Sequence, residues 1–252
     1  MAKSELIYGI HAVTSLLQNF PERIEKLYVL HGREDQRLQE ILYMARENTI
    51  PIQALSRPEL DQLISSNHHQ GVIADYHAPK NFTEDDLFDI LENLDEPPFL
   101  LILDGIQDPH NLGACIRSAN AAGVHAVLAP KDRNVALTPT ARKVASGAAE
   151  ITPFIQVTNL ARTLRQLREQ QIWIYGLDDE APTNLYEADL QGGIALVLGA
   201  EGEGLRRLTR EHCDVLLAIP MTGSVSSLNV SVATGVCLFE VVRQRQCQRR
   251  LV

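Results

Sequence analysis

Residues 219–235 read IPMTGSVSSLNVSVATG and contain no charged side chain. The segment starts like the end of a buried strand and finishes inside a helical pattern, so it predicts a turn between the two. Ser224, Ser226 and Ser227 offer hydroxyls that can cap the helix. Asn229 adds an amide that both donates and accepts hydrogen bonds. A serine cap explains one of these residues, whereas the whole neutral, polar stretch suits a ligand with an adenine or ribose edge.

A glycine-rich loop precedes this segment, in LVLGAEGEGL at residues 196–205. Its glycines, Gly199, Gly202 and Gly204, permit positive φ and close approach of the backbone to a ligand. The pattern is neither G-x-G-x-x-G nor G-x-x-x-x-G-K-S/T. Its two glutamates would repel a pyrophosphate, which disfavours a nicotinamide cofactor. The alternative is an ordinary strand–helix turn with surface acids.

A third unusual loop lies at residues 103–119, in LDGIQDPHNLGACIRSA. Asp108 and Pro109 favour a turn, and Asn111 is the expected N-cap of a helix that starts at the next residue. Arg117 shares one side of that helix with small residues, which leave space around its guanidinium. An ordinary exposed helix arginine is the alternative reading.

These loops fall at the ends of strands in a regular alternation that begins at Phe99. The run FLLILDGI has no polar alternation, which is typical of a strand covered on both faces. Strand–helix alternation predicts an α/β fold with a doubly wound, mainly parallel sheet, in which ligands bind at the carboxyl ends of strands. The expected strands are 99–106, 125–130, 153–157, 172–177, 193–201 and 215–220; the expected helices are 111–123, 139–147, 159–171, 205–213 and a long one from about 228.

A smaller α/β unit is expected before this sheet, with strands at 25–31, 50–55 and 71–76 and helices at 9–19, 35–48 and 57–64. An acidic stretch bracketed by prolines follows and should contain one helix. The expected organisation is therefore a first domain over 1–78, a linker over 79–97 and a second domain over 98–252.

The charge of the chain is unevenly distributed. Its 252 residues carry 23 basic and 32 acidic side chains, a net charge of −9. Seven of the acids lie between Glu84 and Glu96 with no base among them, so the remainder carries −9 + 7 = −2. Arginines and lysines cluster elsewhere, around 131–143, 162–168 and 243–250. Solvated helix faces account for such clusters, but an RNA partner is equally permitted.

Several classes of protein are disfavoured by the sequence. The four cysteines form no C-x-x-C pair, so we expect neither a zinc site nor a disulfide scaffold. The N-terminus lacks the apolar core of a signal peptide, and no apolar run is long enough to span a bilayer. A soluble, cytoplasmic protein without a metal is the expectation.

Taken together and in order, the three loops resemble the three motifs of the SpoU (TrmH-like) family of RNA ribose 2′-O-methyltransferases, in the SPOUT superfamily. Two N-terminal segments, IYGIHAVTSLL at 7–17 and HHQGVIA at 68–74, are similar to the substrate-binding extension of the bacterial 23S ribosomal RNA guanosine-2′-O-methyltransferases in that family. The resemblance implies a C-terminal α/β-knot domain with a deep trefoil knot, an L30e-like N-terminal domain that binds RNA, and a homodimer.

The resemblance also implies an activity and a site. The family uses S-adenosylmethionine to methylate a ribose 2′-hydroxyl, here that of a specific guanosine in 23S ribosomal RNA. A tRNA substrate, or a non-catalytic RNA- or ribosome-binding role on the same fold, are the alternatives. Backbone groups near Gly199, Ile219 and Leu228 would hold the adenosine. The implied catalytic residues are Asn111, Arg117, Glu201, Ser227 and Asn229.

Overall fold

The computed structural model describes residues 4–33, 35–64, 69–77, 82–200 and 202–249. The chain divides into two compact units, and each contains segments that are distant in the sequence. The first unit combines Met1–Lys80 with Pro139–Ile151, and the second combines Asn81–Thr138 with Thr152–Val252. None of the described helices is both long and apolar enough to cross a membrane.

The first unit is built on a four-stranded sheet in the order β1-β4-β2-β3. The strands are β1 (Ser4–Tyr8), β2 (Ile24–Leu30), β3 (Ile52–Leu55) and β4 (Val72–His77). β4 is antiparallel to both of its neighbours, β1 and β2, whereas β2 and β3 are parallel. β1 was not expected from the sequence, because its existence depends on pairing with β4 at the far end of the unit.

In the part of this unit that the structure describes, five helices accompany the sheet, two of them from the distant segment. They are α1 (Ile10–Asn19), α2 (Gln36–Glu47), α3 (Arg57–Ile64), α6 (Pro139–Ala145) and α7 (Ala148–Ile151), with a short 3-10 turn at Pro21–Arg23. The helix expected over 139–147 is confirmed as α6, which ends at Ala145 because Ser146 (φ 53°) and Gly147 (φ 90°) leave the helical region before α7 begins. A Cβ on Gly147 would lie 2.3 Å from the Cβ of Ser15, so α1 and this turn pack closely.

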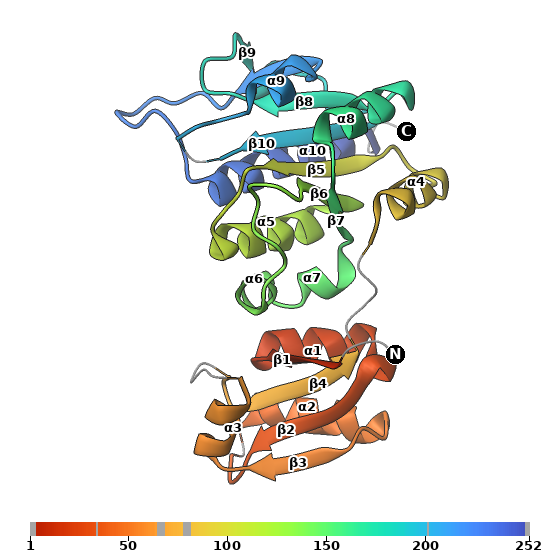
Figure 1. The fold of residues 1–252 in the computed structure, drawn as a ribbon, viewed down its shortest axis with the longest axis vertical. Helices are drawn as coiled ribbons and strands as arrows, with labels where there is room; N and C mark the ends of the chain where they lie inside the picture. Colours follow the sequence, from red (N-terminus) through yellow and green to blue (C-terminus); the bar gives the residue numbers. More distant parts are fainter. Residues whose placement is uncertain (1–3, 34, 65–68, 78–81, 201, 250–252) are drawn as a thin grey trace. The chain divides into compact units, whose positions relative to one another are not determined.

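The second unit contains a seven-stranded sheet in which the paired strands are all parallel. The order is β7-β6-β5-β10-β8-β11-β9, as Figure 1 shows for the larger part of the sheet. The mainly parallel sheet expected from the alternation is confirmed. The strands are β5 (Phe99–Asp104), β6 (Ala126–Pro130), β7 (Phe154–Val157), β8 (Trp173–Leu177), β9 (Thr183–Asn184), β10 (Ile194–Gly199) and β11 (Val215–Ala218).

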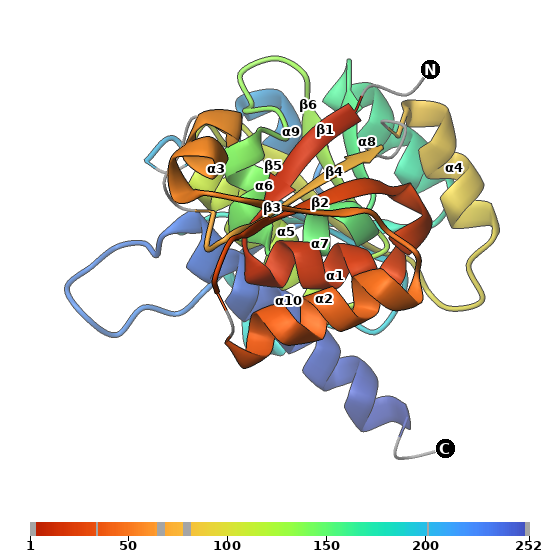
Figure 2. The ribbon, with the colours of Figure 1, turned by 90° about the horizontal axis from the view of Figure 1, so that it is seen from below.

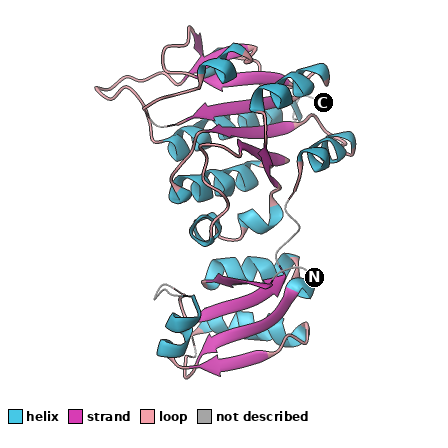
Figure 3. Ribbon diagram, viewed as in Figure 1, coloured by secondary structure: helices cyan, strands magenta, loops and turns pink. Residues whose placement is uncertain are grey.

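Helices cover both faces of this sheet (Figure 3). Alternate residues of the central strands, such as Leu100 and Ile102, form one buried cluster with side chains of α4 and α8. On the other face α5 and α10 pack against each other, and α10 contacts β10. The helices are α4 (Glu84–Glu92), α5 (Pro109–Ala122), α8 (Leu160–Glu169), α9 (Arg207–Glu211) and α10 (Val230–Arg249), with a 3-10 turn at Leu185–Glu187.

The acidic stretch folds onto the second unit as α4. Thr83 caps it in a capping box with Asp86, the local signal that starts the helix. One carboxylate oxygen of Glu84 accepts a hydrogen bond of 2.7 Å from the backbone N–H of Thr158, and the other lies 2.6 Å from Arg162 Nη2. The helix expected in this stretch is confirmed, and its first acid attaches it to the loop after β7.

Candidate active site

Four adjacent strands of the seven-stranded sheet send their carboxyl-end loops to the same edge. β10 pairs in parallel with β5 on one side and with β8 on the other, and β11 pairs in parallel with β8. The chain runs outward from β5 to β7 and then continues on the opposite side of β5, so the strand order reverses here. Such a switch point is where open α/β sheets bind their ligands.

A cavity of about 640 Å³ lies at this edge. Its volume falls within the roughly 300–1,000 Å³ of small-molecule sites. Gly199, Ile219 and Leu228, the residues implied for adenosine binding, all line it. So do Ser227 and Asn229. The structure thus brings the glycine loop and the loop before α10 together around one hollow.

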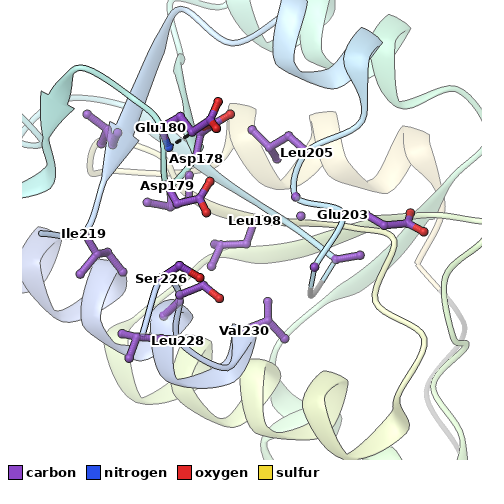
Figure 4. Close-up of a pocket in the computed structure, with 18 of the residues that line it drawn as sticks. Asp178, Asp179, Glu180, Leu198, Glu203, Leu205, Ile219, Ser226, Leu228 and Val230 are labelled. Atoms are coloured by element: carbon purple, nitrogen blue, oxygen red, sulfur yellow. Dashed lines mark hydrogen bonds between the residues drawn. The ribbon is translucent and has the colours of Figure 1, made fainter. Parts of the chain in front are cut away.

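The cavity combines apolar walls with carboxylates. Figure 4 shows Leu198, Ile219, Leu228 and Val230 around the hollow. These side chains come from β10, the loop after β11 and the start of α10. An apolar lining with a few polar groups is typical of sites for small organic ligands.

The glycine loop folds back on the end of β10. The backbone N–H of Gly204 donates to the carbonyl of Ala200 at 2.9 Å, and both Gly202 (φ +78°) and Gly204 (φ +64°) are left-handed. A Cβ on Gly199 would lie 2.1 Å from the backbone of Gly204, so only glycine fits at that position. Glu201, implied as a catalytic residue, lies outside the described residues.

The loop before α10 is largely exposed over residues 222–227 and reaches out from its unit in Figure 2. α10 begins at Val230, and the Asn229 side-chain oxygen accepts hydrogen bonds from the Ser231 N–H at 3.0 Å and from its hydroxyl at 2.6 Å. Asn229, rather than one of the serines that could have capped it, thus caps the helix. Asn229 takes that role because it immediately precedes the first helical residue.

Asn111 is also not a helix cap. Asp108 caps α5 by accepting from the His110 N–H at 2.8 Å, and Pro109 occupies the first helical position, which proline favours. Asn111 therefore sits in the first turn, where its side-chain oxygen accepts a 3.1 Å hydrogen bond from the Asn229 amide. This bond joins the loop at 103–119 to the loop at 219–235, across 118 residues of sequence.

Arg117 lies farther along α5 on an exposed position and does not line the cavity. Six residues at about 100° each place it roughly 120° around the helix axis from Asn111. The structure thus connects Asn111 to the cavity through Asn229 but does not bring Arg117 to it. The catalytic role of Arg117 stays a prediction.

Sequence reasoning missed the acids that follow β8. Asp178, Asp179 and Glu180 line the cavity, and Figure 4 shows the 3.0 Å hydrogen bond from the Glu180 N–H to Asp178. The second Asp178 oxygen lies 3.0 Å from Arg210 Nη1. Their place in the sequence could have identified them, because these acids come directly after a buried strand and ligands bind at the carboxyl ends of such strands.

An ion pair between the partly exposed Arg206 and a buried carboxylate holds the end of the glycine loop against β5. Asp104, only 1% exposed, lies 3.2 Å from Arg206 Nε and accepts from the Arg206 backbone N–H at 3.3 Å. The Arg206 guanidinium also donates to the carbonyl of Asp132 at 3.3 Å. Asp104 therefore fixes the loop that lines the cavity.

Cys213 lies beside the same strands but is not a nucleophile. Burial, with a smaller contribution from the nearby carboxylates of Asp214, Asp104 and Asp178, raises the pKa of its thiol to about 12. The thiol is therefore protonated at neutral pH and unreactive. Among the residues that the structure describes, no three His, Cys, Asp or Glu side chains gather as metal ligands.

Two regions of the chain match known families. Residues 98–239 match the SpoU rRNA Methylase family, and residues 6–82 match a family described as RNA 2′-O ribose methyltransferase substrate binding. The first match contains all three loops described above.

Individual proteins resemble nearly the whole chain. It is 58% identical over 242 residues to the 23S rRNA (guanosine-2′-O-)-methyltransferase RlmB of Escherichia coli K12, covering 96% of this chain and 99% of the relative. The identity to RlmB of Photorhabdus laumondii is 59% over the same length and shares. A solved structure named as an RNA 2′-O ribose methyltransferase superposes with a TM-score of 0.81 at 26% identity, covering 97% of this chain and 90% of that one.

Proposed function

Because the chain belongs to the SpoU rRNA methylase family, we propose that it methylates the ribose 2′-hydroxyl of a guanosine in 23S ribosomal RNA. The relatives that match 96% of its length carry that activity in their names. The observation that carries the proposal is the cavity at the sheet edge. The loops at 199–204 and 219–229 line it, and the Asn111–Asn229 hydrogen bond ties the loop at 103–119 to it.

The cofactor is S-adenosylmethionine, and the cavity fits it. The neutral loop from Ile219 to Leu228 offers backbone groups for an adenosine, and Gly199 lets the opposite loop fold closely. The carboxylates of Asp179 and Glu180 add negative charge to the lining, which suits a cationic ligand. When bound, S-adenosylmethionine supplies an electrophilic methyl group on a sulfonium.

The chain's own residues then have to hold the ribose and handle the proton of its 2′-hydroxyl. Alignment of the reacting atoms can supply much of the rate acceleration. Asn111 and Asn229, fixed by their mutual hydrogen bond, are positioned to orient polar groups at the cavity edge. Because Arg117 does not line the cavity of its own chain, we propose that the second copy in the homodimer supplies its cation, which stabilises charge that develops on the 2′-oxygen. A base role would need a neutral guanidinium, which is costly because its pKa exceeds about 12.

Transfer of labelled methyl groups from S-adenosylmethionine to purified RNAs tests this function. The wild-type protein should label 23S ribosomal RNA from a strain that lacks the gene, at one guanosine 2′-oxygen, and should not label tRNA. Arg117→Ala should lose most of the rate on saturating RNA while calorimetry finds the cofactor affinity unchanged. Arg165→Ala, which removes an exposed cation from α8, is the matched control and should retain the rate.

The alternatives predict different results in the same assay. Labelling of tRNA alone would identify a tRNA methyltransferase. Binding of RNA and cofactor without any labelling would identify a non-catalytic RNA-binding protein. A wild-type rate for Arg117→Ala would remove that residue from the catalytic machinery.

We also propose that the N-terminal domain holds the RNA substrate and that the protein acts in the cytoplasm, where ribosomal RNA is found. The match of residues 6–82 to a substrate-binding family supports the first point. Deletion of residues 1–80 should preserve cofactor binding by the remaining chain and abolish methylation of 23S RNA.

A homodimer is a further part of the proposal. On α10, Val232 (51% exposed) and Phe239 (49% exposed) lie seven residues apart and hence on one face. Exposed large apolar side chains in a row along a helix suit a second copy of the chain. Phe239→Glu should shift the protein toward monomer in sedimentation experiments. Leu208→Glu, a change at an equally exposed leucine on α9, should not.

The trefoil knot implied by the resemblance is likewise proposed for this chain. The insertion of β10 between β5 and β8 supports it, because the chain must return to the middle of the sheet after β8 is in place. Small residues in the glycine loop and in the loop before α10 would permit such a tight path.

A further inference from the structure

The first unit contains a pocket of about 310 Å³ that is separate from the cavity at the seven-stranded sheet. Three of its seven lining residues are cations, and they come from three parts of the chain. Arg33 follows β2, Arg57 opens α3 and Lys143 lies on α6. All belong to the same compact unit. The other lining residues are Leu30, His69, Gln70 and Gly71.

The position of Arg33 is fixed by the turn that precedes β4. Gly71 has a φ of +71°, and a Cβ there would lie 2.8 Å from Arg33 Nη1. Because Gly71 has no side chain, the Arg33 guanidinium lies directly against its backbone, where it donates to the carbonyl of Gln70 and pairs with Asp35. A cation held in this way loses little conformational entropy when a ligand binds.

His69 forms a wall of the pocket, and both of its ring nitrogens have partners in the protein. It is 2% exposed, and its Nδ1 accepts a 2.9 Å hydrogen bond from the Gly71 N–H. Because Nδ1 is the acceptor, the ring proton is on Nε2, which faces Asp61 Oδ1 at 3.0 Å. Both ring nitrogens are thus engaged by the protein, so binding of an anion falls to the arginines and the lysine.

Lys143 is brought to the pocket by the packing of α6 and α7 in the first unit. The neighbouring Arg142 lies 2.6 Å from Glu150, whose other oxygen accepts from the Tyr76 hydroxyl at 3.0 Å. These groups anchor the two helices to β4. The Lys143 ammonium lies 5.3 Å from the centre of the Tyr8 ring, a cation–π distance.

We propose that this pocket binds a phosphate group of the RNA backbone, with Arg33, Arg57 and Lys143 as its ligands. Three cations around one hollow stand out in a chain whose net charge is −9. Arginine and lysine are the usual partners of nucleic-acid phosphates. The inference rests on the proposed function, and it adds a contact from α6, outside the residues that match the substrate-binding family.

Fluorescence anisotropy with an end-labelled transcript of a 23S RNA fragment, measured over a range of KCl concentrations, tests the pocket in the full-length protein. Arg57→Ala and Lys143→Ala should each weaken binding about tenfold, the effect of one charged hydrogen bond. Each should also reduce the slope of log K against log salt by about 1. The losses should be equal for an unrelated RNA duplex, because a phosphate contact carries no sequence information.

Arg46→Ala removes an exposed cation of α2 outside the pocket and is the matched control, which should bind RNA as the wild type does. The far-UV circular dichroism and the urea unfolding curve should match those of the wild type in all three variants, which shows that they are folded. Wild-type RNA affinity and salt slope in both pocket variants would overturn the proposal. So would a wild-type protein that does not bind RNA, whatever its activity. Methylation by the wild type is scored separately, so a failure of the proposed activity is distinguishable from a failure of the pocket.

Discussion

Replacement of Gly199 by alanine is the sharpest test of the cavity's construction. The new methyl group would lie 2.1 Å from the backbone carbon and oxygen of Gly204 and 2.5 Å from the backbone nitrogen of Leu205. These neighbours are main-chain atoms, so no side-chain rotation can relieve the clash. The glycine loop would have to move away from the end of β10.

The size of the effect follows from two contributions. Overpacking of a tight site costs about 1–3 kcal/mol. The displaced loop also loses the 2.9 Å hydrogen bond from the Gly204 N–H to Ala200, which contributes about 1 kcal/mol. Together these cost about 2–4 kcal/mol, so the affinity for S-adenosylmethionine should fall by about 30-fold or more.

Isothermal titration calorimetry measures this affinity directly, and urea unfolding reports whether the variant remains folded. Gly223→Ala is the matched control, because Gly223 lies in the other cavity-forming loop and an added Cβ would meet nothing within 4 Å. It should bind the cofactor as the wild type does. Wild-type affinity in Gly199→Ala would refute the reasoning, since it would mean that the loop does not form the cavity wall as described.

Three further outcomes are expected. Arg206→Ala should lower the free energy of unfolding in urea by about 3 kcal/mol, because it removes the ion-pair partner of the buried Asp104 carboxylate. Adding Asp104→Asn should restore part of the lost free energy of unfolding. Burial opposes the charged form of Glu84, yet hydrogen bonds to it outweigh burial and lower its pKa. Its contribution to stability should therefore be present above about pH 4.3 and be lost as the pH falls through the folded-state pKa. Glu84→Gln should remove this acid-side loss from a profile of unfolding free energy against pH. A thiol reagent at pH 8 should modify exposed Cys247 first, since burial raises the pKa of Cys237 to about 12, and Cys247→Ser should remove the fast phase seen by mass spectrometry.

The sequence by itself determined the elements whose signals are local. The continuous apolar run at 99–104 marks a strand covered on both faces, and all six of its residues are buried. Glycine and small polar residues after strands mark the loops at 199–204 and 219–229, and both line the cavity. Such features depend on side chains within a few residues of one another, so a pattern in the sequence contains the whole cause.

Tertiary structure decided everything that depends on distant partners. Asn111 is suited to cap a helix by its residue type, but its side chain instead accepts a hydrogen bond from Asn229, 118 residues away. The acids after β8 belong to the cavity because β10 inserts beside β8. Lys143 joins the first unit because α6 packs there. In each case the deciding energy is packing or hydrogen bonding between segments far apart in the chain, and no local pattern encodes which segments will meet.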